Sequence, residues 1–176
     1  SRNNPPFVPQ DNPTGLYARD FVLPEGFEGM ELHLMLGGVE SGYYLWINGR
    51  PVGYSQDSKL MSDFDVTPFM RPGKNRVALQ VMRFTDATWL EDQDYWHLSG
   101  IFRPVALFAK PKRHIRDFKV TAWADGRFQA RVQLSRVDGF GDTQVRLSLY
   151  GAQGAPCFSQ VQRPGVEPYY RNDHTP

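Results

Sequence analysis

The residues best suited to chemistry lie together between positions 89 and 97, in the stretch WLEDQDYWH. These nine positions hold three carboxylates, three aromatic side chains and one histidine. Carboxylate oxygens accept hydrogen bonds from adjacent sugar hydroxyls, and aromatic rings stack on the apolar C–H face of a pyranose. A loop of this composition is therefore suited to carbohydrate binding.

The same residues also have simpler interpretations. Acidic loops between strands are usually solvated, and Trp89 and Trp96 would fit equally well in a hydrophobic core. Composition alone leaves both interpretations open.

The elements that position this stretch belong to a globular protein. The chain has 176 residues, of which 40% are hydrophobic and 14% aromatic. That is enough to bury the core of about one to one and a half domains. Its 20 Lys and Arg residues nearly balance 19 Asp and Glu residues, the net charge is +1, and neither sign forms a run. This balance argues against nucleic acid or a membrane surface as a partner.

Cysteine content and hydropathy indicate the compartment. Cys157 is the only cysteine of the chain, which excludes an internal disulfide and is typical of a reducing environment. The first residues, SRNNPPFVPQ, hold no apolar signal-peptide core. No later stretch approaches the roughly 20 apolar residues of a membrane span. We therefore expect a cytoplasmic protein.

Period-two alternation of apolar and other residues is the recurrent pattern and predicts β-strands. It is clearest at 31–36 and 76–82. Asn48–Gly49 predicts a tight hairpin turn between two β-prone runs, and RPGKN at 71–75 predicts a second turn. No window of ten or more residues has helical spacing, and 16 Gly and 14 Pro interrupt the chain. The predicted fold class is all-β, a sandwich or jelly roll.

A second β unit is expected after the polar hinge AKPKRH at 109–114. Alternation restarts there in three runs, at 118–122, 128–134 and 145–149, before the polar tail RPGVEPYYRNDHTP. An immunoglobulin-like sandwich needs about seven strands. We expect a unit that is cut short or partly ordered, with a complete small domain as the alternative.

The order of residues in the acidic stretch resembles a family signature. LEDQDYWHLSGIFR, residues 90–103, closely resembles the DQDxWxxSGIFR signature in the N-terminal domain of the large bacterial β-galactosidases of glycoside hydrolase family 2. Stretches at 4–17, 45–60 and 62–81 resemble the same domain in the same order. Four ordered blocks are far more specific than one short motif.

The resemblance implies a jelly-roll sugar-binding domain at residues 1–111, followed at 112–176 by the beginning of a truncated immunoglobulin-like sandwich. In this family a TIM barrel follows and hydrolyses terminal β-D-galactosides such as lactose with retention, using one glutamate as acid/base and another as nucleophile. Both glutamates belong to the barrel, so we expect no catalytic residue here and no activity of the chain alone. The full-length enzyme is expected to be a homo-oligomer.

The resemblance also assigns one functional residue, Asp94, the second aspartate of DQD. In the family this carboxylate reaches into the mouth of the barrel, binds galactose hydroxyls and helps to ligate a sodium ion. A carboxylate is a hard oxygen ligand and a bidentate hydrogen-bond acceptor, which suits both roles. The remaining sodium ligands and the magnesium ligands belong to the barrel, so the chain alone should bind sodium weakly or not at all.

Neighbouring candidates are expected to be structural. Asp92 should be solvated or cap a turn, Trp46 and Trp96 should be core or interface aromatics, and Arg103 should anchor the strand that SGIF begins. His97 stands where the relatives usually carry arginine. The four histidines are too scattered in sequence to indicate a metal site.

Two other functions are left open. The chain could be a free-standing carbohydrate-binding module, which sugar affinity of the isolated chain would indicate. It could also be a structural or oligomerisation domain, which self-association without sugar binding would indicate.

Overall fold

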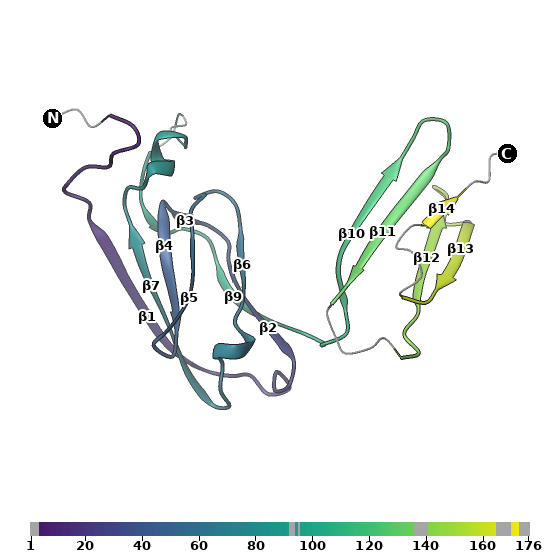
Figure 1. The fold of residues 1–176 in the computed structure, drawn as a ribbon, viewed down its shortest axis with the longest axis horizontal. Coiled ribbons are helices and arrows are strands. Elements are labelled where there is room, and N and C mark those ends of the chain that lie inside the picture. Colours follow the sequence, from purple (N-terminus) through teal and green to yellow (C-terminus); the bar gives the residue numbers. More distant parts are fainter. Residues whose placement is uncertain (1–3, 92–93, 95, 136–140, 165–169, 173–176) are drawn as a thin grey trace. The chain divides into compact units, whose positions relative to one another are not determined.

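The computed structural model describes residues 4–91, 94, 96–135, 141–164 and 170–172 (Figure 1). In these ranges the chain forms fourteen strands and two short 3₁₀ turns, and no α-helix. The predicted all-β class is confirmed. The chain separates into two compact units, here called unit 1 (Ser1–Pro111) and unit 2 (Lys112–Pro176).

Unit 1 contains two antiparallel sheets and a small separate pair of strands. Sheet A has the strand order β1 (Thr14–Val22), β7 (Lys74–Met82), β4 (Gly42–Ile47) and β5 (Arg50–Ser55). Sheet B places β2 (Glu31–Leu36) between β6 (Ser62–Asp65) and β9 (Val105–Lys110). The short strands β3 (Val39–Glu40) and β8 (Gly100–Ile101) pair with each other. Since the chain crosses between the sheets from β1 to β2, from β5 to β6 and from β6 to β7, unit 1 is a jelly-roll sandwich.

The core of unit 1 lies between the two sheets and explains the alternation in the sequence. Along β2, every second residue is buried. These leucines belong to one packed cluster with residues of β4 and β7 from the other sheet, comprising Leu32, Leu34, Leu36, Leu45, Ile47, Leu79 and Val81. The period-two pattern thus marks strands with one face in the core, as predicted.

The hairpin turn predicted at Asn48–Gly49 joins β4 to β5. Asn48 has a φ of 52° and Gly49 a φ of 79°, the left-handed pair that a two-residue hairpin turn with the native twist requires. Glycine adopts this conformation without steric cost, and asparagine adopts it more readily than other side chains.

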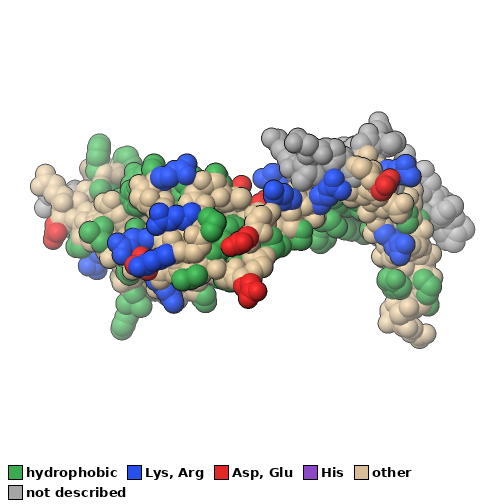
Figure 2. All heavy atoms as spheres, turned by 90° about the horizontal axis from the view of Figure 1, so that it is seen from below, with side chains coloured by type: hydrophobic (Ala, Val, Ile, Leu, Met, Phe, Trp, Pro, Cys, Tyr) green, Lys and Arg blue, Asp and Glu red, His purple; other side chains and the backbone are tan. Residues whose placement is uncertain are grey.

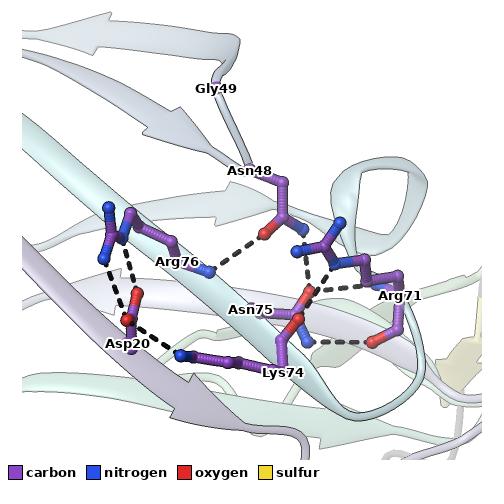
Figure 3. Close-up of a pocket in the computed structure, with 7 residues that line it drawn as sticks. All are labelled: Asp20, Asn48, Gly49, Arg71, Lys74, Asn75 and Arg76. Atoms are coloured by element: carbon purple, nitrogen blue, oxygen red, sulfur yellow. Dashed lines mark hydrogen bonds and ion pairs between the residues drawn. The ribbon is translucent and has the colours of Figure 1, made fainter.

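A buried amide, Asn75, ties this hairpin to the second predicted turn (Figure 3). Its side chain is 1% exposed. The Oδ1 atom accepts hydrogen bonds from Asn48 Nδ2 at 2.8 Å and from the Arg71 amide at 3.0 Å. The Nδ2 atom donates to the carbonyls of Arg71 at 2.8 Å and Gly73 at 3.0 Å. One side chain therefore holds both turns at this end of sheet A.

Unit 2 contains more strands than the sequence predicts. The three expected runs form β10 (Ile115–Ala122), β11 (Phe128–Leu134) and β12 (Val145–Tyr150), but β13 (Pro156–Gln162) pairs with β12, and β14 (Tyr170–Asn172) pairs with β11. The sequence hid β13 because its larger apolar residues, Phe158 and Val161, are three positions apart and break the alternation. The strand β14 is too short for any periodicity.

Candidate functional site

The residues between β7 and the acidic stretch are held in place by hydrogen bonds of Thr85. A 3₁₀ turn, η2 (Asp86–Trp89), is capped by Thr85, whose side chain and backbone both exchange hydrogen bonds with Thr88. The Thr85 hydroxyl also lies 3.0 Å from the hydroxyl of buried Ser41. The start of the stretch is thus attached to the core.

Glu91 fixes the part of the stretch that precedes Asp94, residues 86–91, which we call the first arm. Its amide donates to the carbonyl of Ala87 at 2.9 Å. Its Oε1 atom accepts a hydrogen bond of 3.1 Å from the amide of Ser58, a residue with no exposed surface. This arm is therefore fastened to the segment between β5 and β6.

Glu40 fixes the part of the stretch that follows Asp94, residues 97–100, which we call the second arm. Its Oε1 atom lies 2.9 Å from Nδ1 of His97, and its Oε2 atom accepts a hydrogen bond of 2.9 Å from the amide of Ser99. Ser99 and Gly100 have φ values of 63° and 86°. The sequence analysis did not select Glu40, although a carboxylate within the otherwise apolar and small run GGVESGYY is a signal that could have drawn attention to it.

Asp94 lies between the two arms. It is exposed, and its carboxylate forms neither an ion pair nor a hydrogen bond with any other residue that the structure describes. An exposed carboxylate without such partners is able to accept hydrogen bonds from a ligand. Asp92 lies outside the described residues, so its expected role as a solvated or turn-capping residue stays a prediction.

Large exposed apolar side chains flank Asp94 in sequence and follow Ser58, which is hydrogen-bonded to Glu91, and we call them the apolar rim. Leu90 is 89% exposed and Trp96 is 83% exposed. Leu60 and Met61, which follow the Ser58 residue bonded to Glu91, are exposed as well. The apolar rim thus consists of Leu60, Met61, Leu90, Trp96 and Leu98. The interpretation of Trp96 as a core residue is therefore wrong, because its side chain is left in solvent, whereas the interface interpretation is untested.

Two other candidates from the sequence have structural contacts. Trp46 lies half-buried beside Tyr44, with ring centroids 5.9 Å apart, and is not among the buried core residues. Arg103 donates to the carbonyl of Lys59 at 2.6 Å and to that of Gly37 at 3.4 Å. It thereby anchors the segment that follows β8, as the sequence predicted.

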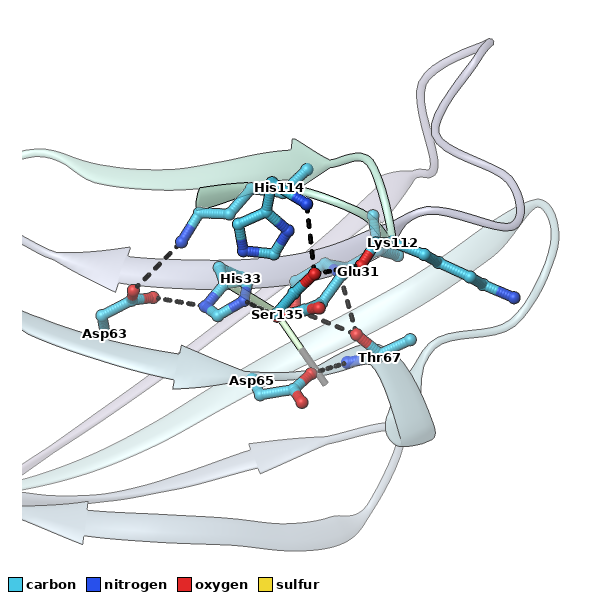
Figure 4. A network of polar contacts seen from close by, with 10 residues as sticks. Glu31, His33, Asp63, Asp65, Thr67, Lys112, His114 and Ser135 are labelled. Atoms are coloured by element: carbon cyan, nitrogen blue, oxygen red, sulfur yellow. Dashed lines mark hydrogen bonds and ion pairs between the residues drawn. The ribbon is translucent and has the colours of Figure 1, made fainter. Parts of the chain in front are cut away.

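His33 lies in a polar network across the strands of sheet B (Figure 4). Its Nε2 atom is 2.8 Å from Glu31 and its Nδ1 atom is 3.0 Å from Asp63. Lys110 on β9 approaches Asp63 at 3.7 Å. Both ring nitrogens are thus engaged with carboxylates, and no group of three or more His, Cys, Asp or Glu in the described ranges is arranged to hold a metal ion.

Three basic residues, Arg71, Lys74 and Arg76, lie at the end of sheet A where Asn75 joins the two turns, and we call them the basic cluster. Figure 2 shows Lys and Arg side chains gathered on one face of unit 1, and Figure 3 shows Asp20 among them. Asp20 accepts hydrogen bonds of 2.5 and 2.9 Å from Arg76, which lower the pKa of its carboxyl from 3.8 to about 2, and Lys74 at 3.4 Å adds to the effect. The positive charges are thus partly neutralised within the cluster.

Two further observations concern the surroundings of the protein. Within the described ranges, no helix is long and apolar enough to cross a membrane. Cys157 is an exposed free thiol.

Comparison with known sequences gives a family match over unit 1. Residues 2–111 match the family described as "Glycosyl hydrolases family 2, sugar binding domain". A β-galactosidase of Yersinia pestis bv. Antiqua is 51% identical over 160 residues, which cover 84% of this chain and 15% of that protein. "Beta-galactosidase 2" of Enterobacter cloacae is 41% identical over 167 residues, which cover 92% of this chain and 16% of that protein.

Comparison with solved structures supports the same architecture at lower identity. A Bacteroides uniformis β-glucuronidase 2 matches with a TM-score of 0.71 and 20% identity, over 92% of this chain and 21% of that chain. A Faecalibacterium prausnitzii β-glucuronidase matches with a TM-score of 0.67 and 21% identity, over 89% of this chain and 31% of that chain. At this identity the likeness concerns the fold alone. The chain spans about a sixth of the length of the two β-galactosidases.

Proposed function

Since this chain belongs to glycosyl hydrolase family 2, as its four ordered sequence blocks predicted, we propose that it is the sugar-binding N-terminal part of a retaining β-galactosidase. In this proposal unit 1 binds the terminal galactose of a β-galactoside, and a catalytic barrel further along the same polypeptide cleaves the glycosidic bond. The proposed domains are the jelly roll at 1–111 and the beginning of an immunoglobulin-like sandwich at 112–176.

The observation that carries the proposal is the exposed carboxylate of Asp94 on a stretch fastened at both ends. Its two oxygens are available to accept hydrogen bonds from neighbouring sugar hydroxyls, and bonds to an ionised acceptor are the stronger kind. The anchors at Glu91 and Glu40 reduce the entropy that a loop loses when it binds a ligand. Asp94 is therefore our proposed substrate-binding residue.

The apolar rim supports contact between this stretch and a larger body. Soluble domains rarely leave a group of large apolar side chains in water unless it forms an interface, and Leu90, Trp96 and Leu98 are each more than three-quarters exposed. In the proposal the rim packs against the barrel of the same polypeptide, which places Asp94 at the mouth of the active site.

Asp94 is also our proposed sodium ligand. An ionised carboxylate is a hard oxygen donor that fits an alkali cation, but a single donor does not make a selective site. The described residues offer no cluster of three candidate ligands, so the other sodium ligands, and those for magnesium, would come from elsewhere in the enzyme. A bound sodium ion would help to fix the orientation of the sugar hydroxyls.

The remaining parts of the proposal concern the whole enzyme. Retaining hydrolysis needs two carboxyl groups about 5 to 5.5 Å apart across the anomeric carbon, and we place both glutamates in the barrel, so that this chain alone is inactive. We further propose a homo-oligomer in the cytoplasm, a location compatible with the free, exposed thiol of Cys157.

The substrate class is tested with the full-length polypeptide that carries this chain. Aryl β-galactoside and aryl β-glucuronide should be compared, because the structural neighbours include β-glucuronidases. We expect hydrolysis of the galactoside to dominate. A preference for the glucuronide, or affinity of the isolated chain for sugar without any galactosidase activity of the full-length protein, would overturn the proposal.

A further inference from the structure

Glu40 is a carboxylate buried in the sandwich. Its side chain is 5% exposed, and its chain neighbours Val39 and Ser41 are buried as well. Removing a carboxylate from water costs several kcal/mol unless hydrogen bonds compensate the charge. The partners of Glu40 must therefore hold it strongly.

Within the described residues, the hydrogen-bond partners of the Glu40 carboxylate both belong to the second arm of the acidic stretch. One oxygen contacts the ring of His97 and the other accepts from the amide of Ser99, each at 2.9 Å. The carboxylate thus bridges a side chain and a backbone group two residues apart. The pairing of β3 with β8 continues this attachment, since Glu40 lies opposite Gly100.

The bridge lies close to Asp94 along the chain. Asp94 is three residues before His97, and three residues of extended chain span at most about 11 Å. On the other side, the contact between Glu91 and Ser58 at 3.1 Å fixes the chain three residues before Asp94. The two anchors therefore limit the distance over which Asp94 can move.

We propose that Glu40 is the positioning residue of the sugar site: it sets the location of Asp94 by holding His97 and Ser99 against the core strand β3. The inference rests on the proposed role of Asp94. Glu40 itself is buried, and the proposal gives it no contact with the sugar. Its effect on turnover passes through His97 and Ser99 to Asp94, and it should disappear when Asp94 no longer binds sugar.

The test uses Glu40→Gln in the full-length enzyme. The glutamine oxygen can still accept from the Ser99 amide, but its NH₂ group can only donate to His97 Nδ1, which requires the other imidazole tautomer and removes the ionised acceptor, so this attachment is weakened. A misplacement of about 1 Å at a site can cost on the order of a hundredfold in rate, and we expect a loss of at least about tenfold in kcat/KM for an aryl β-galactoside.

The control is Asn75→Ala, which removes a buried polar side chain at the Asn48–Gly49 end of sheet A, where it has no contact with the acidic stretch. At a temperature well below unfolding it should leave kcat/KM within about twofold of the wild-type value, as expected for a change outside the site. Hydrogen exchange of the peptide at 94–101 should rise in Glu40→Gln and not in Asn75→Ala.

The double variant separates positioning from general stability. In an Asp94→Asn background, Glu40→Gln should cause no further loss beyond about twofold, because coupled residues are not additive. If the two losses multiply, or if Glu40→Gln has full activity while Asp94→Asn does not, the positioning role is wrong. If Asp94→Asn alone leaves turnover intact, the proposed function itself fails.

His97 supplies an independent variant should Glu40→Gln fold poorly. His97→Ala removes the side-chain donor and should lower kcat/KM by about tenfold, whereas His97→Arg offers a guanidinium that can donate to Glu40 and should restore most of the activity. Equal losses in His97→Ala and His97→Arg would contradict the bridge as the positioning element.

Discussion

Asn75→Ala tests how unit 1 is held together at one end of sheet A. The substitution removes four hydrogen bonds from a side chain that is 1% exposed. At a net value of about 1 kcal/mol each, the loss is about 4 kcal/mol. Asn48 keeps a second acceptor at the Phe69 carbonyl, and the Gly73 carbonyl keeps the Leu23 amide. The expected loss is therefore nearer to about 3 kcal/mol.

The measurement is urea unfolding at neutral pH, followed by tryptophan fluorescence, with Asn12→Ala as the control. Asn12 is the same residue type but forms only two such hydrogen bonds, both 2.9 Å long and both with the backbone of Phe84. Its removal should cost about 1 to 1.5 kcal/mol. A loss for Asn75→Ala no larger than that for Asn12→Ala would refute the view that Asn75 locks the two turns.

Three further predictions concern two local features of unit 1 and the activity of the chain alone. Because Arg76 lowers the pKa of Asp20 from 3.8 to about 2, this ion pair should stabilise the fold above about pH 4 and lose its effect as the pH falls towards 2; the difference in unfolding free energy between wild type and Asp20→Asn should shrink over that window and stay constant above it. Gly100→Ala should cost about 2 kcal/mol or more in urea unfolding, since its φ of 86° disfavours a side chain and a Cβ would lie 2.7 Å from the Tyr17 hydroxyl; Gly26→Ala, with a φ of 84° and no atom within 4 Å, should cost less. The purified chain alone should hydrolyse no aryl β-galactoside above background, since we place both catalytic carboxylates outside it, and turnover that survives removal of host enzyme would contradict this.

The alternation of apolar residues and the residue types of the turns were sufficient to predict much of unit 1. The leucines of β2 alternate because one face of the strand lies in the core, and Asn48–Gly49 combines the two residue types that best tolerate a positive φ. In unit 2 the same rule found β10, β11 and β12 but missed β13, where the apolar residues do not alternate.

The surroundings of Asp94 depend on contacts that no local rule contains. Glu40 and His97 are 57 positions apart, and Ser58 and Glu91 are 33 apart. Trp96 shows a different limit, because an aromatic residue next to a strand is typical of a core and here is exposed. The exposure of such a residue depends on how the folded chain packs around it, which its residue type does not specify.

The role of Asp94 is tested most directly by Asp94→Asn in the full-length enzyme, with kcat/KM measured for an aryl β-galactoside across a series of sodium concentrations. The amide keeps the shape of the side chain but removes its charge. A charge-assisted hydrogen bond is worth about 1.5 to 3 kcal/mol, so turnover should fall by about tenfold to a hundredfold, and the sodium response should fall with it. Asp92→Asn is the control and should change kcat/KM by less than about threefold, as most surface substitutions do. If Asp92→Asn cripples the enzyme while Asp94→Asn leaves turnover and sodium dependence intact, the proposed sugar site is wrong.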